Sequence, residues 1–163
     1  MASANAAFVR CCELARQHGF GRIEAANLPM VPVTSYYSLD LPRVDREVTE
    51  AVELAMRVGH YRGMLVARLA AWSGALLAWD LAEASAHGRE PEALTARVSA
   101  QRFAAEILLY RAEGRMLAGD RARAADLAAQ AMLICREAAI GQLGHGRELG
   151  AHSLSQLVRG DSV

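Results

Sequence analysis

The sequence predicts an all-α protein in which antiparallel helical hairpins repeat about every 40 residues and stack into a solenoid. Composition gives the first reason. Alanine makes up about a fifth of the chain while Val, Ile, Phe and Thr are sparse, and this favours packed helices over sheets. The second reason is that residues of one type recur at a fixed spacing, which is typical of a repeat array.

Four columns of residues share a spacing of 40. They are Asp40, Asp80 and Asp120; Arg22, Arg62 and Arg102; Leu14, Leu54, Leu94 and Ile134; and Val44, Ala84 and Ala124. Each aspartate precedes an apolar stretch of helical periodicity, where its short carboxylate can accept hydrogen bonds from free backbone N–H groups. We therefore expect a single domain, 1–163, with hairpins at about 22–58, 62–98 and 102–138 and half-repeats at 5–18 and 147–158.

Prolines and glycines interrupt this pattern in two places. Pro29 and Pro32 fall inside the first long helix and predict a kink or a break there. Gly88 and Pro91 likewise predict that the segment 80–98 divides into two short helices.

Small and large apolar residues both fit stacked helices. Ala112, Ala124 and Ala131 occupy the spacing at which tetratricopeptide repeats keep small residues, so that paired helices approach closely. Trp72 and Trp79, seven apart, would share one helical face, and we expect both in the core.

Three blocks of the chain resemble a known family. They are Cys12–Met30 (CELARQHGFGRIEAANLPM), Ala55–Arg62 (AMRVGHYR) and Arg102–Leu108 (RFAAEIL). These blocks are similar to the tetratricopeptide-like carboxy-terminal regions of large bacterial adenylate/guanylate cyclase-like proteins and related ATPase transcriptional regulators. The likeness spans about Ala7–Ile140. It implies that a cyclase catalytic domain or a DNA-binding module, and then an ATPase module, precede such repeats in the parent proteins.

Several function classes are excluded by composition. The chain has no lysine, so a GxxxxGK[ST] phosphate loop is impossible. With 18 basic and 18 acidic residues the formal charge is zero, which argues against a nucleic-acid partner. No apolar run is long enough to cross a membrane, and the amino-terminal residues do not read as a signal peptide. The three cysteines, without CxxC spacing, favour reduced thiols in a cytoplasm.

We therefore expect a cytoplasmic, bacterial, non-catalytic module for protein interaction or signal sensing. Given the resemblance, we expect it to be the carboxy-terminal regulatory part of a larger cyclase-like or ATPase-type signalling protein. We expect no catalytic residue, no cofactor and no bound metal. The partner would be a protein, a peptide or an attached domain of the parent chain. First helices of stacked hairpins line the concave face of a solenoid, which makes Asn27, Arg68, Tyr110 and Glu113 candidate partner contacts.

Two alternatives belong to other function classes. His145, Glu148 and His152 could share one helical face, a spacing compatible with a small metal-binding protein or enzyme. A simple homodimerisation unit is the other alternative, because incomplete terminal repeats would expose apolar faces. The residues concerned are Phe8, Val9, Leu154, Leu157 and Val158.

Overall fold

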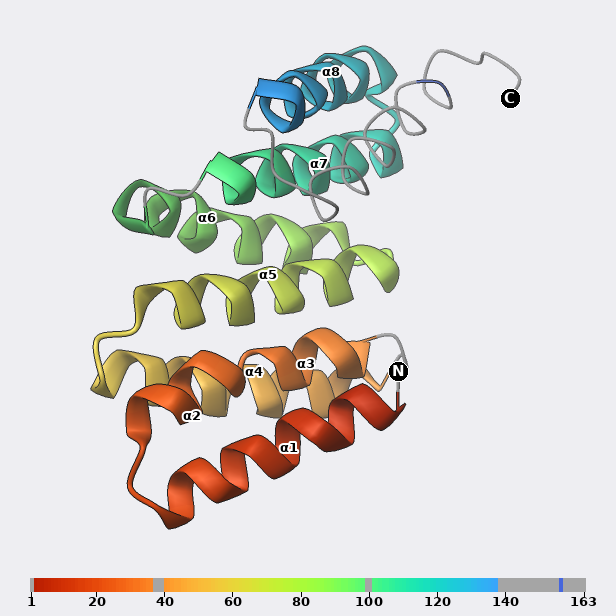
Figure 1. Cartoon of the computed structure of the whole chain (residues 1–163). Helices are drawn as coiled ribbons and strands as arrows, with labels where there is room; N and C mark the ends of the chain where they lie inside the picture. The colour runs from red at the N-terminus through yellow and green to blue at the C-terminus, as the bar shows by residue number, and fades with distance from the viewer. Residues whose placement is uncertain (1, 37–39, 99–100, 138–155, 157–163) are drawn as a thin grey trace.

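The computed structural model describes residues 2–36, 40–98, 101–137 and 156, and its described part contains helices and no strand (Figure 1). The helices are α1 (Ala2–Gln17), α2 (Gly21–Asn27), α3 (Met30–Ser35), α4 (Leu41–Arg57), α5 (Tyr61–Leu77), α6 (Leu81–Val98), α7 (Gln101–Leu117) and α8 (Arg121–Glu137). Apart from α3, the helices after α1 begin at 21, 41, 61, 81, 101 and 121, so 20 residues separate each start from the next. The predicted all-α class is confirmed.

Three of the described helices, α4, α6 and α8, directly follow an aspartate that caps their backbone. The distances are 3.2 Å from Arg43 N to Asp40 Oδ1, 3.0 Å from Glu83 N to Asp80 Oδ1 and 3.2 Å from Arg123 N to Asp120 Oδ1. Each carboxylate satisfies a backbone N–H that has no partner within its helix. The capping role predicted for these aspartates is confirmed.

Four turns of the described part contain a residue in the left-handed backbone region. Gly19, Gly59 and Gly119 have φ values of 71°, 67° and 83°, and Trp79 has a φ of 60°. Trp79 is 74% exposed, whereas Trp72 is 4% exposed. The expectation that Trp79 lies in the core is therefore wrong. Two residues seven apart share a face only within one helix, and α5 ends at Leu77, before Trp79.

The first long helix is broken at proline, as predicted. α2 ends at Asn27 and α3 begins at Met30, with Pro29 immediately before it. Pro32 lies in the first turn of α3, where a missing N–H costs little. Both prolines are fully buried.

The prediction that segment 80–98 divides into two short helices is wrong. α6 is one helix, with Pro91 inside it. Gly88 does not end a helix here. A Cβ at this position would lie 2.9 Å from Cζ2 of Trp72, so the glycine allows α6 to pack closely on α5. Pro91 removes one backbone hydrogen bond, which bends a helix but need not end it.

The columns of apolar residues mostly face the core. Val44, Ala84, Ala124, Leu54 and Leu94 are all buried. Leu14 is 41% exposed, against the pattern of its column, and among the described helices α1 packs mainly on α2 and α3.

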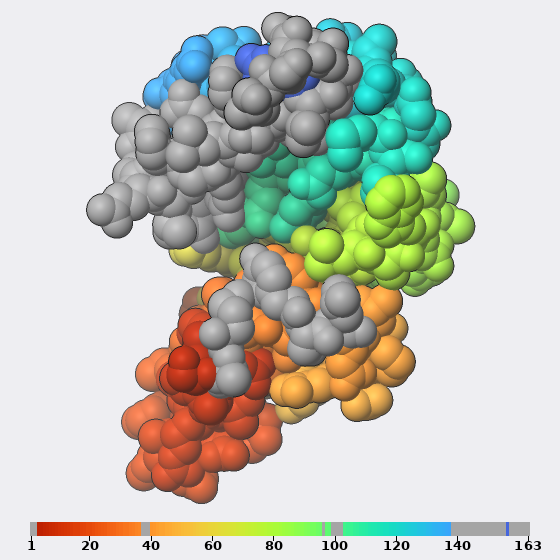
Figure 2. Space-filling model, turned by 90° about the vertical axis from the view of Figure 1, so that its right-hand side faces the viewer, coloured from red at the N-terminus to blue at the C-terminus, as the bar shows by residue number. Residues whose placement is uncertain are grey.

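Consecutive helices lie side by side along the molecule (Figure 1), and Figure 2 shows α1 and α8 toward opposite ends. The contacts between α7 and α8, α5 and α6, and α4 and α5 are the most extensive, while α6 touches α7 over a smaller area. The helices that open successive pairs also touch one another: α2 and α3 contact α5, and α5 contacts α7. No comparable contact links α4 to α6 or α6 to α8 within the described ranges.

Candidate functional site

The four residues predicted from sequence as partner contacts all lie on helices that open a pair. Asn27 ends α2, Arg68 belongs to α5, and Tyr110 and Glu113 belong to α7. Asn27 is held by its own helix, because its Nδ2 donates to Ile23 O at 2.8 Å. The four residues thus share a row of contacting helices without forming one cluster.

Arg68 connects α5 to α6. Its Nε lies 2.8 Å from Oε2 of Glu90, and the two side chains are 30% and 43% exposed. The Nε–H of Arg68 makes no hydrogen bond with any described residue, so the contact with Glu90 is an ion pair without a hydrogen bond. Exposure of both groups limits what this pair adds to stability.

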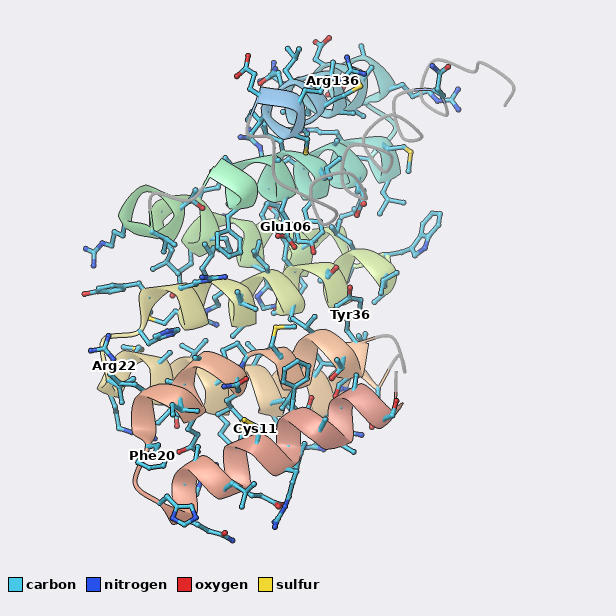
Figure 3. The ribbon with its side chains drawn as sticks, viewed as in Figure 1. Cys11, Phe20, Arg22, Tyr36, Glu106 and Arg136 are labelled. Carbon is cyan, nitrogen blue, oxygen red and sulfur yellow. The ribbon has the colours of Figure 1, made fainter. Side chains whose placement is uncertain are left out.

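Tyr110 joins a polar cluster between α5 and α7. Its hydroxyl donates to Oε1 of Glu106 at 3.2 Å and also bonds Ser73. Burial raises the pKa of Tyr110 well above its usual value, and the Glu106 carboxylate adds to this shift. Figure 3 shows Glu106 between the ribbons of α5 and α7. The phenol therefore stays protonated and acts as a hydrogen-bond donor.

Glu113 lies one turn beyond Tyr110 on α7. Burial raises the pKa of its carboxyl group above the usual value for Glu. A carboxylate that is partly withdrawn from water is drawn to any cation or donor brought to it. A cation or a hydrogen-bond donor placed beside Glu113 would therefore stabilise its ionised carboxylate.

A cavity of about 380 Å³ lies between α5, α6 and α7. Its buried wall is apolar and consists of Trp72, Leu76 and Ala84. In the described part of the chain its rim carries three arginines and one acid, namely Arg89, Arg111, Arg115 and Glu92. The remaining lining residues are Leu81, Ser85, Gly88, Tyr110, Gly114 and Ala118. Of the four predicted contacts, only Tyr110 reaches this cavity.

Two contacts shape the cavity. The ring of Tyr110 meets the ring of Trp72 edge to face, with 5.6 Å between centroids. Oε1 of Glu92 lies 3.5 Å from Nε of Arg111, which holds that guanidinium between α6 and α7. An aromatic wall and a cationic rim therefore meet in one place.

This cavity was not predicted from the sequence. The arginines at its rim come from two different helices, α6 and α7. One signal was available: Ala84, Ser85 and Gly88 put three small residues on one face of α6. A groove needs a facing helix with small residues as well, and that pairing is visible only in the fold.

Neither a reactive Cys12 thiol nor a cluster of metal ligands occurs in the described part of the chain. Burial, followed by the neighbouring Cys11, raises the pKa of Cys12 to about 11, so its thiol is a poor nucleophile. No group of three metal-binding side chains occurs among the described residues. His145, Glu148 and His152, and likewise Leu154, Leu157 and Val158, lie outside them. A search of the described helices found none with the length and apolar content needed to cross a membrane.

Comparisons with protein-family models, with curated proteins and with solved structures found no match for this chain.

Proposed function

We propose that the chain forms a tetratricopeptide-like solenoid of helical hairpins and works as a non-catalytic module that binds a segment of a protein partner. The regular helix starts support the repeat, because an equal length of chain serves each helix and turn. The resemblance seen in the sequence adds the expectation of a regulatory role beside a cyclase-like or ATPase-type domain.

The observation that carries this proposal is a row of contacting helices. α2 and α3 both contact α5, and α5 contacts α7. In a helical solenoid the inner helices touch their counterparts in the next pair, and the outer helices splay apart. The inner helices then form one continuous face. Such a face suits an extended or helical segment of another protein, because recognition can be spread over several pairs.

The side chains on this face favour a partner segment with polar groups. Arg68 and Glu113 offer a cation and a partly buried carboxyl group, whereas the hydroxyl of Tyr110 already donates to Glu106. A segment that carries both a basic and an acidic side chain would satisfy them together. We also propose that the protein is cytoplasmic, and the small number of cysteines, three without CxxC spacing, supports this.

Selection from a random peptide library tests the proposal. We expect the purified chain to enrich peptides whose binding is lost in the charge reversal Glu113→Arg, because this change turns attraction into repulsion on the proposed face. Glu53→Arg is the matched control, since Glu53 is exposed on the outer helix α4. Peptides that bind both variants equally, or no enrichment at all, would contradict the proposal.

A further inference from the structure

We propose that the cavity between α5, α6 and α7 binds a small organic anion, in which a carboxylate or a phosphate is attached to an apolar body. The proposal goes beyond the function proposed above. It concerns a small-molecule site, and it holds whether or not a protein segment binds the inner face.

The cavity results from small residues on two facing helices. Ala84, Ser85 and Gly88 of α6 lie opposite Gly114 of α7 and Ala118 just beyond it. α6 is drawn onto α5 at Gly88, where the Trp72 ring occupies the space that a side chain would need. The contact between α6 and α7 is correspondingly small. The space left is about 380 Å³, within the usual size range of small-molecule sites.

The rim explains why the ligand should be an anion. Among the described residues, three guanidinium groups, from Arg89, Arg111 and Arg115, stand against the one carboxylate of Glu92. The chain as a whole has equal numbers of basic and acidic residues, so this is a local excess of positive charge. Guanidinium groups match planar or tetrahedral oxyanions with two parallel hydrogen bonds. Arg111 is already held by Glu92, which leaves Arg89 and Arg115 at the exposed rim.

The wall explains why the ligand should also carry an apolar body. Trp72 and Leu76 are 4% and 5% exposed, and Tyr110 packs edge to face on Trp72. An aromatic ring or a branched alkyl group would fill the space beside this wall and gain contacts with it. A free inorganic anion would leave that space unfilled and would bind only through the rim.

Tryptophan fluorescence provides a direct binding assay. The chain has two tryptophans, so the variant Trp79→Phe leaves Trp72, in the cavity wall, as the reporter. We expect 4-phenylbutyrate or phenyl phosphate to cause a saturable change in Trp72 emission. Which of the two binds more tightly identifies the oxyanion. The neutral amide of 4-phenylbutyrate and inorganic phosphate should each bind about tenfold more weakly or not at all.

Variants locate the site. The double change Arg89→Gln with Arg115→Gln should weaken binding at least about tenfold, and Ser85→Leu should weaken it by filling the cavity. Arg121→Gln is the matched control, because Arg121 is exposed on α8 and does not line the cavity. Circular dichroism checks that each variant keeps its helical content.

Three results would overturn the proposal. One is emission that does not change with either probe. Another is binding that survives both the double arginine variant and Ser85→Leu. The third is binding of a carboxylate-terminated peptide, such as acetyl-Gly-Gly-Phe, when neither small probe binds, because the site would then belong to a protein partner.

Discussion

Trp79 occupies a backbone conformation that its residue type disfavours. The three other turns with a positive φ have glycine at the corresponding position. A side chain in the left-handed region costs about 1–2 kcal/mol, and 74% exposure means that burial returns little of this cost within the chain. The strain at this turn therefore gives a clear mutational test.

Trp79→Gly should raise the free energy of unfolding by about 1 kcal/mol relative to Trp79→Ala. Both changes remove the indole, and only glycine accepts a φ of 60° without strain. Urea unfolding measures the difference. The reverse change Gly59→Ala should lower stability by a similar amount, because Gly59 has a φ of 67°. No described atom lies within 4 Å of an added Cβ there, so backbone strain is the cost expected. Equal stability of the two Trp79 variants would contradict this account.

His60 caps the start of α5 with a hydrogen bond that depends on pH. Its Nδ1 accepts a hydrogen bond from Gly63 N at 3.0 Å, which requires that nitrogen to be unprotonated. Burial lowers the pKa of His60 below the usual histidine value of 6.5, and the charges of Arg22 and Arg62 add to the shift. Between the folded and unfolded pKa values the unfolded chain binds more protons, so stability rises with pH in that window.

The contribution of His60 to stability should therefore be present above pH 6.5 and decrease as the pH falls through and below that value. His60→Asn keeps a capping acceptor and removes the titration. We expect the stability difference between the native chain and this variant to change between neutral pH and about pH 5. Urea unfolding at several pH values measures it, and a difference independent of pH would show that His60 is not the titrating group.

Sequence reasoning was successful at residues whose role is local. The caps at Asp40, Asp80 and Asp120 follow from the chemistry of a short carboxylate before a helix, and all three form the expected hydrogen bonds. Trp79 could not be placed in this way. Its hydrophobic character predicts burial, and only the end of α5 two residues earlier moves it to the surface.

Among the helices, α6 shows how packing decides between interpretations of glycine and proline. Gly88 and Pro91 indicated a helix end, but the ring of Trp72 needs the space beside Gly88, and α6 continues to Val98. Trp72 lies on a different helix, α5, so this requirement is not visible in the local sequence. The break at Pro29 was predictable because it depends on the backbone of the same segment.

Gly88→Ala should lower the free energy of unfolding by about 1–3 kcal/mol, because the added Cβ would force Trp72 or α6 to move. Gly114→Ala, on the facing helix, is the matched control. Its Cβ would lie 3.6 Å from Cδ2 of Leu76, an ordinary contact, and alanine should stabilise α7 by about 0.5–1 kcal/mol. Thermal or urea unfolding compares the two, and a neutral effect of Gly88→Ala would contradict the close packing described.

Sequence patterns do not predict the cavity either, because it depends on contacts between different helices. It depends on how α6 and α7 face each other, and the residues of its rim are separated along the chain. Tyr110 was predicted as a partner contact because it lies on the first helix of a hairpin. Its neighbours Trp72 and Glu106 became clear only from the fold.

Across the whole molecule, contacts run mainly between helices that are neighbours in the chain or in adjacent pairs. In the solenoid that we propose, stability would come from nearest-neighbour interfaces, and the inner face would stay continuous when pairs are added. The proposed binding role depends on this open arrangement. A closed bundle would bring the first and last helices together and cover the inner face.

The distance between α1 and α8 tests this arrangement most directly. Spin labels attached through unnatural amino acids at Leu14 and Leu133, both exposed, leave the three cysteines unchanged. Packed helices lie 8–10 Å apart, so four steps from α1 through α3, α5 and α7 to α8 predict a distance of roughly 30–40 Å by pulsed electron paramagnetic resonance. A distance below about 20 Å, as for two adjacent helices with their labels, would contradict the stacked arrangement.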